Sequence, residues 1–323
     1  MTESRTSAKD QDVDVTFFSD RAATGSQDSM SSAPSRLFEV KRQAFFLLRI
    51  LAASRILFFP GLLLQYLKIN IWRKLKCGTR KHDPMYFLVH KYYLSKRLTV
   101  KERIQSAIEH HAYELKNFNR LYESDVYRGI GIIIWERRID DHRFSIILTG
   151  SEDNRNEGEL SIIFTADSQY LWRTSFSYVN SDIFQLHHGV TILISRNQAE
   201  DTSYRGLFIE YFGQNQLQFL CLSAVCGIAT ANGWTKILCI RHNLQIAYED
   251  RYEIGFRNSY TILWQQFDAR EIDRHVYELD VPLKVRPLQL INRSHRARAR
   301  ARRQYWDSIT CSARTALIGY RLF

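Results

Sequence analysis

The sequence predicts an α+β fold, with a mainly antiparallel central sheet, N-terminal helices and a helix–strand crossover. Five runs rich in β-branched and aromatic residues, joined by polar or glycine-bearing turns, predict the sheet: VYRGIGIIIWERR, RFSIILTG, GELSIIFTA, YLWRTSFSYV and GVTILISRN. Successive strands with such short connections pair most economically as an antiparallel meander. The apolar run 215–231, which ends at an Asn-Gly pair, predicts a helix, and KILCI (236–240) a buried strand after it. A helix between two strands predicts a parallel crossover.

Composition indicates one main globular domain. The chain has 323 residues, of which 45% are hydrophobic and 13% aromatic, enough to form a sizeable core. The net charge of +11 favours encounters with anionic surfaces, such as lipid headgroups, lipopolysaccharide or nucleic acid. Charge alone does not select among these partners.

Five cysteines occur without a C-x-x-C pair, and three of them lie in apolar runs. This pattern favours free thiols in a reducing compartment over disulfides or a zinc site. We therefore expect no metal site, and the sequence identifies no cofactor.

The N-terminal region divides into two parts. Residues 1–36 lack apolar periodicity, so we expect a disordered tail and no secretory signal peptide. Residues 37–98 form an apolar and basic helical segment, whose longest uncharged run, 56–67, is too short to span a bilayer. The segment 43–76 either packs on the core or contacts an anionic membrane surface. We expect the protein to be cytoplasmic. In the membrane-contact alternative, it would be attached peripherally to the inner membrane.

The run 99–123 predicts one amphipathic helix. Thr99 and Glu102 have the spacing of a capping box, and apolar residues recur at helical spacing after them. The adjacent His110 and His111 point about 100° apart on a helix, so we expect one to be solvated and the other packed. The later run YRGLFIEYF (204–212) is interpreted as a further strand.

Two carboxylates are candidate catalytic groups. Glu157 and Glu159 flank Gly158 at a strand entrance, and such a pair could act as acid and base if burial raised the pKa of one. Alternation along a strand would place both on one face. The simpler alternative is a solvated turn.

The order of elements, a meander followed by a long helix, KILCI and then RHNLQIAYEDRYEIGF, is similar to the acyl-CoA N-acyltransferase fold. The resemblance implies cofactor-binding roles for Gly213, Gln214 and Asn243, and a catalytic role for Tyr248. However, only Gly213 stands where two close glycines would cradle a pyrophosphate. We therefore expect a packed corner, with Tyr248 and Phe256 on the sheet and Asn243 capping the next helix.

A second resemblance covers residues 85–310. The motifs EGELSI, the Tyr-x-x-x-Trp of Tyr260 and Trp264, and the Arg-rich helix before YWDS resemble the VirK/YbjX family of bacterial proteins. The resemblance implies an association with virulence and envelope integrity in Gram-negative bacteria, including surface localisation of a virulence protein and resistance to cationic peptides. No reaction is assigned to that family.

The stretch NRSHRARARARRQYW is a candidate anion-binding helix. Arg296, Arg300 and Arg303 share one face at helical spacing, and guanidinium groups suit phosphates. The alternative is a solvated helix whose arginines pair with acidic neighbours. Nucleic acid is not an expected partner, because no recognised binding module accompanies the charge.

Three functions follow from these observations. The first is an accessory protein for virulence and envelope integrity, with an anionic lipid surface or envelope proteins as partners. The second is an acyl-CoA-dependent acyltransferase, and the third a phosphate- or nucleic-acid-binding protein.

Overall fold

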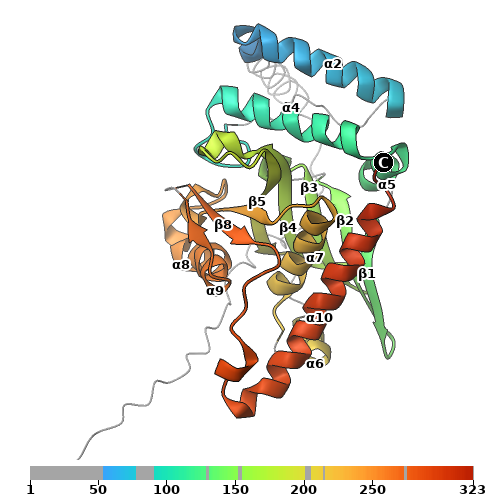
Figure 1. Cartoon of the computed structure of the whole chain (residues 1–323), viewed down its shortest axis with the longest axis vertical. Coiled ribbons are helices and arrows are strands. Elements are labelled where there is room, and N and C mark those ends of the chain that lie inside the picture. Colours follow the sequence, from blue (N-terminus) through green and yellow to red (C-terminus); the bar gives the residue numbers. More distant parts are fainter. Residues whose placement is uncertain are drawn as a thin grey trace, which may run out of the picture.

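The computed structural model describes residues 54–77, 91–128, 131–151, 155–200, 205–213, 215–272 and 275–322. The expected tail 1–36 and the candidate residue Gln214 lie outside this described part. An eight-stranded sheet forms the centre of the molecule, and helices cover it (Figure 1).

The sheet has the strand order β1-β2-β3-β4-β5-β6-β8-β7. The strands are β1 (Ile132–Ile139), β2 (His142–Gly150), β3 (Leu160–Ala166), β4 (Gln169–Asn180), β5 (Val190–Ala199), β6 (Lys236–Ile240), β7 (Arg270–Glu271) and β8 (Val276–Asp280). All neighbours pair antiparallel except β5 and β6, which are parallel. The predicted mixed fold, with a mainly antiparallel sheet and one crossover, is confirmed.

The helical elements precede, interrupt and follow the strands. Besides short 3-10 turns, they are η1 (Arg55–Phe58), α2 (Pro60–Cys77), α4 (Val100–Asn117), α5 (Arg120–Tyr127), α6 (Arg205–Phe212), α7 (Leu217–Ala231), α8 (Glu253–Arg257), α9 (Leu263–Gln266) and α10 (Arg293–Ile318). A π-helical turn, η6 (Asn258–Ile262), joins α8 to α9. Helix α7 is the expected crossover helix between β5 and β6.

Alternation along the parallel strands supplies two apolar cores. Ile192 and Ile194 of β5 join the larger core with α7 and α10, whereas Leu193 between them joins a smaller core with α4. Successive side chains of a strand point to opposite faces, so β5 faces apolar surroundings on both sides. This explains why β5 reads as a nearly continuous apolar run.

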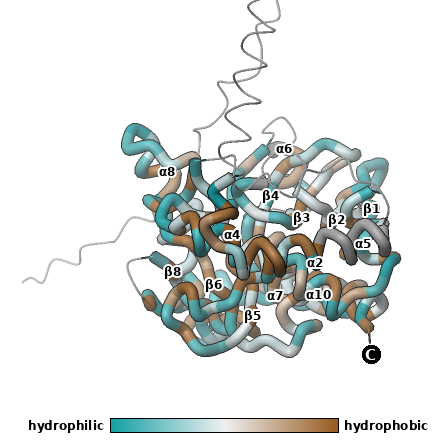
Figure 2. The backbone as a smooth tube through the Cα atoms, turned by 90° about the horizontal axis from the view of Figure 1, so that it is seen from above, coloured by the Kyte–Doolittle hydropathy of each residue, from teal (hydrophilic) through white to brown (hydrophobic). Residues whose placement is uncertain are grey.

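Helices α2 and α4 form stacked layers at one end of the molecule (Figure 1). Ile104 and Ile108 of α4 and Tyr66 of α2 are buried in the smaller core. Seen from the α2 side, apolar stretches of both helices overlie the sheet (Figure 2). Thr99 accepts a hydrogen bond from the Glu102 amide, and the predicted capping box at the start of α4 is confirmed.

Two predictions of secondary structure were wrong. The expected single helix 99–123 breaks at Phe118, which is extended, because the Asn119 side chain caps a new helix by accepting a hydrogen bond from the Tyr122 amide. The expected strand 204–212 is helix α6. Phe208 and Phe212 are one helical turn apart and are both buried, so a helix places both rings in the core.

Helices α7 and α10 approach closely at Gly227. A Cβ atom at this position would lie 2.6 Å from the Ala313 Cβ atom and would also contact the Thr310 carbonyl oxygen. The Thr310 hydroxyl donates a hydrogen bond of 3.0 Å to the Ser223 carbonyl oxygen, which fixes the two helices in this register.

We expect Gly227→Ala to lower the free energy of unfolding by roughly 1–3 kcal/mol, because the added methyl group overpacks the α7–α10 contact. Urea denaturation measures the change. Gly206→Ala is the matched control: Gly206 lies in α6, and an added Cβ there meets no atom within 4 Å. Equal stability of the two variants would contradict the close packing.

Candidate functional site

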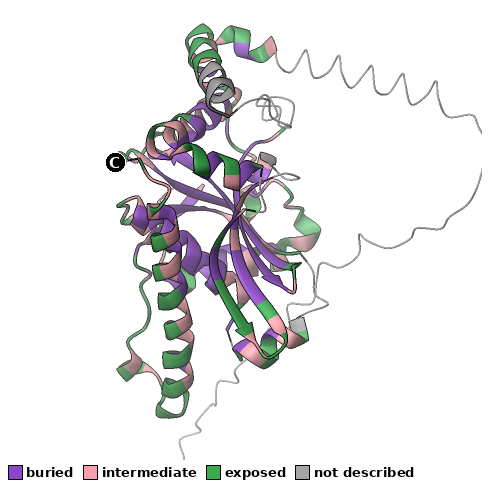
Figure 3. Cartoon of the chain, turned by 90° about the vertical axis from the view of Figure 1, so that its right-hand side faces the viewer, coloured by how far each residue is buried: buried purple, intermediate pink, exposed green. Residues whose placement is uncertain are grey.

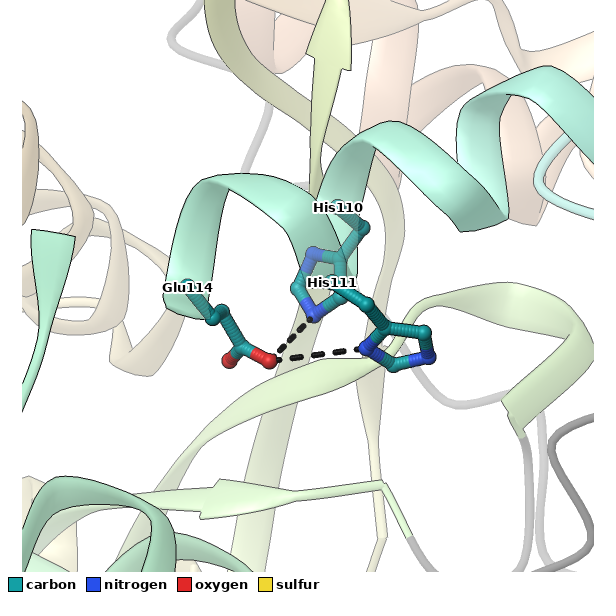
Figure 4. A group of neighbouring side chains, drawn as sticks. All are labelled: His110, His111 and Glu114. Atoms are coloured by element: carbon teal, nitrogen blue, oxygen red, sulfur yellow. Dashed lines mark ion pairs between the residues drawn. The ribbon is translucent and has the colours of Figure 1, made fainter. Parts of the chain in front are cut away.

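His110, His111 and Glu114 of α4 form a buried polar cluster (Figure 4). The His110 Nε2 and His111 Nδ1 atoms lie 3.4 Å and 3.5 Å from Glu114 Oε2. The Tyr127 hydroxyl donates to the same carboxylate, at 2.7 Å from Oε1 and 2.9 Å from Oε2. Both histidines are buried, so the expectation of one solvated ring was wrong. The ring of His110 stacks on Tyr178, while His111 faces the shared carboxylate.

The backbone of β4 fixes the tautomer of His110. The Tyr178 amide N–H donates a hydrogen bond of 3.1 Å to His110 Nδ1. A backbone N–H can only donate, so Nδ1 is the acceptor and Nε2 carries the ring proton. Strand β4 extends past the start of β3, and His110 pairs the Tyr178 N–H at the end of the strand.

The same geometry decides how the cluster can act. His110, His111 and Glu114 offer ligand atoms within 4.8 Å of one another, close enough for a metal ion. Coordination by His110 Nε2 would require an unprotonated nitrogen, but the proton resides there while Nδ1 accepts from Tyr178. The arrangement instead surrounds one carboxylate with hydrogen-bond donors.

Glu114 is held in its ionised form. Burial alone would raise the pKa of Glu114, but the interactions of its carboxylate with His110 and His111 outweigh burial and hold the pKa well below its usual value. The carboxylate also borders a small hollow between α4 and α5, lined by Glu114, Leu115, Phe118, Asn119, Arg120, Tyr122 and Glu123.

Glu157 and Glu159 are buried but have separate partners. The Glu157 carboxylate accepts hydrogen bonds from Arg196 and Gln245, and Glu159 accepts one of 2.9 Å from the Tyr93 hydroxyl. A solvated turn, the simpler alternative, was therefore wrong. Glu157 precedes β3 in a 3-10 turn, so strand alternation does not apply to the pair.

Gly158 separates the two carboxylates. Its φ of +147° and its approach to β4, where a Cβ atom would lie 2.8 Å from the Phe176 amide nitrogen, require glycine. Arg196 bridges Glu157 to Glu200, and these contacts join segments far apart in the sequence. The geometry supports a structural lock rather than a paired acid and base.

The corner after β6 is packed as expected, with one exception. Phe256 is buried, and the Tyr248 ring lies 5.5 Å from it. Asn243 caps no helix. It is exposed in the middle of a 3-10 turn (His242–Leu244), because that turn begins directly after Arg241, which holds the cap position.

The candidate cofactor residues do not form a phosphate cradle in the described part of the chain. Gly213 ends α6 with a φ of +60°, and α7 begins only at Leu217, where Gln216 provides no side-chain cap. Lys96 Nζ donates to the Tyr248 carbonyl oxygen at 2.5 Å, so Tyr248 belongs to a junction with the segment before α4.

Strands β5 and β6 pair through only two residue pairs and then diverge. Two aromatic side chains from the η6–α9 region occupy the divergence. The Tyr260 hydroxyl accepts a hydrogen bond of 3.0 Å from the Asn197 amide, and the Trp264 indole N–H donates one of 3.0 Å to the Ile240 carbonyl oxygen. Both aromatic residues are fully buried. The Tyr-x-x-x-Trp motif thus satisfies the main-chain groups that the diverging strands leave unpaired.

Six arginines lie in the N-terminal half of α10, most of which is exposed or half-buried (Figure 3). Within the described residues none of the six from Arg293 to Arg303 forms an ion pair with a carboxylate. Arg296 donates to the Ile291 and Gln289 carbonyl oxygens, and Arg303 to that of Arg286. Arg300 is exposed. The alternative interpretation, in which these arginines pair with acidic neighbours, is therefore wrong for the described residues.

The segment η1–α2 carries an exposed apolar face. Leu57, Phe58, Leu64 and Leu67 are 64%, 80%, 61% and 44% exposed, although Tyr66 of the same helix is buried. The charged residues of this segment are all basic: Arg55, Lys68, Arg73, Lys74 and Lys76. Among the described helices none is both long and apolar enough to cross a bilayer.

Residues 37–315 match the family described as "Protein of unknown function (DUF535)", and the chain belongs to this family, which is the VirK/YbjX family that the sequence motifs resemble. No curated protein and no solved structure matches the chain.

Sequence reasoning missed Glu114, Tyr127, Arg196 and Gln245. The spacing of His110 and Glu114, four residues apart on a predicted helix, is a local signal that could have paired them. The other partners come from distant segments, and no local pattern marks them.

We expect Glu114→Gln to lower the free energy of unfolding at pH 7 by roughly 3–5 kcal/mol, because the amide group of Gln leaves buried donors facing an NH₂ group. Chemical denaturation measures the loss. Glu210→Gln, on an exposed position of α6, is the control and should change stability by less than about 0.5 kcal/mol.

The same variant tests the ionisation of Glu114. A carboxyl group with a lowered pKa stabilises the fold above its unfolded pKa of about 4.3 and loses this contribution as the pH falls toward the folded pKa. Between about pH 5 and pH 2 the stability of the wild type should therefore fall more steeply than that of Glu114→Gln. Parallel curves would show that Glu114 is not held ionised.

Phe256→Ala should cost roughly 3–5 kcal/mol as a truncation of a buried aromatic side chain. Tyr248→Phe should leave the thermal midpoint almost unchanged, because its ring packing is kept. If Tyr248→Phe abolished a cellular phenotype while the fold stayed intact, the hydroxyl would act chemically and the packed-corner interpretation would be wrong.

Proposed function

We propose that this protein is an accessory protein of the bacterial envelope that attaches peripherally to an anionic membrane surface through η1 and α2. The observation that carries the proposal concerns this one segment. Four of its large apolar side chains are exposed, and all of its charged residues are basic. Apolar side chains enter the headgroup boundary, and basic side chains are attracted to anionic lipid.

The position of α2 supports this role. Helix α2 lies on the outer side of α4, at the end of the molecule (Figures 1 and 3). Leu64, Leu67 and Lys68 are exposed at positions i, i+3 and i+4 and share the outward face. Tyr66 anchors the opposite face in the smaller core. The helix can therefore contact a surface without leaving the fold.

A role in virulence and envelope integrity, including surface localisation of virulence factors and resistance to cationic peptides, is the proposed biological setting. It rests on the VirK/YbjX resemblance. An anionic lipid surface and envelope proteins are the partners that fit such a role.

An acyl-CoA-dependent acyltransferase is the second candidate. The parallel and diverging pair β5–β6 favours it, because ligands of α/β folds bind beyond the carboxyl ends of parallel strands. Tyr260 and Trp264 fill that position and are hydrogen bonded to both strands. Calorimetry with acetyl-CoA tests this candidate, and measurable binding would move it ahead of the accessory role.

Vesicle sedimentation tests the membrane proposal. The wild type should sediment with vesicles that contain phosphatidylglycerol, and less with pure phosphatidylcholine or at high salt. A variant that replaces Leu57, Phe58, Leu64 and Leu67 with Ser or Gln should bind at least about tenfold more weakly, since each inserted apolar side chain contributes about 1 kcal/mol or more.

The matched control replaces two exposed apolar residues elsewhere, Ile254 and Leu290, which are 78% and 61% exposed. It should bind as the wild type does. The membrane proposal fails if the wild type does not bind phosphatidylglycerol vesicles, or if both variants bind equally well. Circular dichroism melting confirms that each variant is folded.

A further inference from the structure

Arg298, Arg302 and Tyr305 share one face of α10 because they follow one another at intervals of four and three residues. The face is directed toward β1. The Arg137 guanidinium of β1 lies 5.2 Å from the centre of the Tyr305 ring, and this ring packs 5.4 Å from Phe212. Arg298 and Arg302 thus precede Tyr305 on the same face of α10, and the Tyr305 ring contacts Arg137 of β1. We call this group the Arg302 cluster.

Arg302 is the unusual member. Its side chain is half-buried, and its Nε atom is shielded from water without a hydrogen-bond partner. Within the described residues Arg302 makes no hydrogen bond and no ion pair. Burial, followed by the charges of Arg298 and Arg303, lowers the pKa of Arg302. An unpaired and partly desolvated cation beside other cations is destabilising in the protein alone.

Nearby acidic groups do not neutralise the cluster. Glu136 precedes Arg137 on β1, so it points to the opposite face, where it is paired with Arg143. Asp140 is hydrogen bonded to Tyr211. Asp307 is exposed, and its position two residues after Tyr305 places it on another side of α10.

The other arginines of the helix differ from Arg302. Arg296 and Arg303 donate to main-chain carbonyl oxygens of the segment before α10, which ties that segment to the helix. Arg298 donates to His295 Nδ1 at 2.5 Å and keeps further donors available. The Nε–H group of Arg302, which has no hydrogen-bond acceptor, therefore distinguishes this position from the other arginines of the helix.

We propose that the Arg302 cluster is a binding site for a phosphate group. A phosphate oxyanion can accept several charge-assisted hydrogen bonds at once, and the planar fork of a guanidinium group matches its oxygen atoms. The phosphate belongs either to a soluble phosphorylated molecule or to a lipid headgroup. This site is separate from the apolar face of η1–α2, because α2 and the first half of α10 lie at opposite ends of the molecule (Figure 1).

Titration calorimetry of the full chain with inorganic pyrophosphate tests the site. Arg302→Gln and Arg298→Gln should each weaken binding about tenfold or more, since a hydrogen bond to a charged group is lost in each. Arg302→Lys keeps the charge but loses the fork, so it should bind between the wild type and Arg302→Gln. The control Arg314→Gln removes the same charge from an exposed position near the other end of α10 and should bind within about twofold of the wild type.

Thermal melting without ligand is a second readout, and it distinguishes a ligand-binding arginine from one that supports the fold. Arg302→Gln should raise the melting temperature, because it removes an unpaired, half-buried cation. Arg303→Gln should lower it, because Arg303 donates to the Arg286 carbonyl oxygen. A fall in the melting temperature of Arg302→Gln would show that the side chain is a structural support and would overturn the proposal.

Vesicles of phosphatidic acid in phosphatidylcholine separate the two sources of phosphate. They are used with the Leu57, Phe58, Leu64 and Leu67 variant, so that attachment through η1–α2 does not contribute. Pyrophosphate binding that depends on Arg302 identifies a soluble ligand, whereas vesicle binding that depends on Arg302 without pyrophosphate binding identifies a headgroup. If neither probe binds, or if Arg314→Gln weakens binding as much as Arg302→Gln, the site does not exist and only the general field of the basic helix remains.

Discussion

Main-chain polar groups at the ends of the central strands must be paired inside the protein, and the rest of the structure depends on this constraint. His110 pairs the Tyr178 N–H, Tyr260 pairs the Asn197 N–H, and Trp264 pairs the Ile240 carbonyl oxygen. An unpaired buried group of this kind would cost free energy comparable to a lost hydrogen bond. The side chains that look most like catalytic groups therefore have a structural use that is sufficient to explain them.

The pairing extends outward from the strands. Glu114 contacts His110, and the Tyr127 hydroxyl of α5 donates a hydrogen bond to Glu114. The hydrogen bond from one amide group of β4 to His110 therefore helps to position α4. On the other side of the crossover, Tyr260 and Trp264 fix the η6–α9 region against the diverging β5 and β6. The polar interior thus orients the helices, while the two apolar cores supply most of the stabilisation.

The parts of the fold that the sequence predicts are those with local causes. Strand alternation, the Thr99 capping box and the Asn-Gly end of α7 all act within a few residues, and each is present. The break before α5 was missed because an apolar residue such as Phe118 continues a helical pattern even where Asn119 starts a new helix.

The candidate site was harder to predict because its partners are distant in sequence. Glu157 is paired with Arg196 and Gln245, which are 39 and 88 residues away, and no spacing rule connects them. The arginines of α10 were visible in the sequence, but the partial burial of Arg302 depends on tertiary packing. The exposed face of α2 likewise becomes apparent only when the buried face is known.

The proposed functional surfaces are therefore the exposed face of η1–α2 and the Arg302 cluster, and the polar interior has a structural role. The position of the ring proton on His110 tests this structural role most directly. Nitrogen-resolved NMR of the histidine rings reports which ring nitrogen carries the proton. We expect the ring proton of His110 to lie on Nε2, with Nδ1 unprotonated, and its signals to be unchanged when zinc is added. A proton on Nδ1, or a shift of both ring nitrogen signals on addition of zinc, would contradict the structural role of the cluster. Either result would support a metal or catalytic centre on α4 instead.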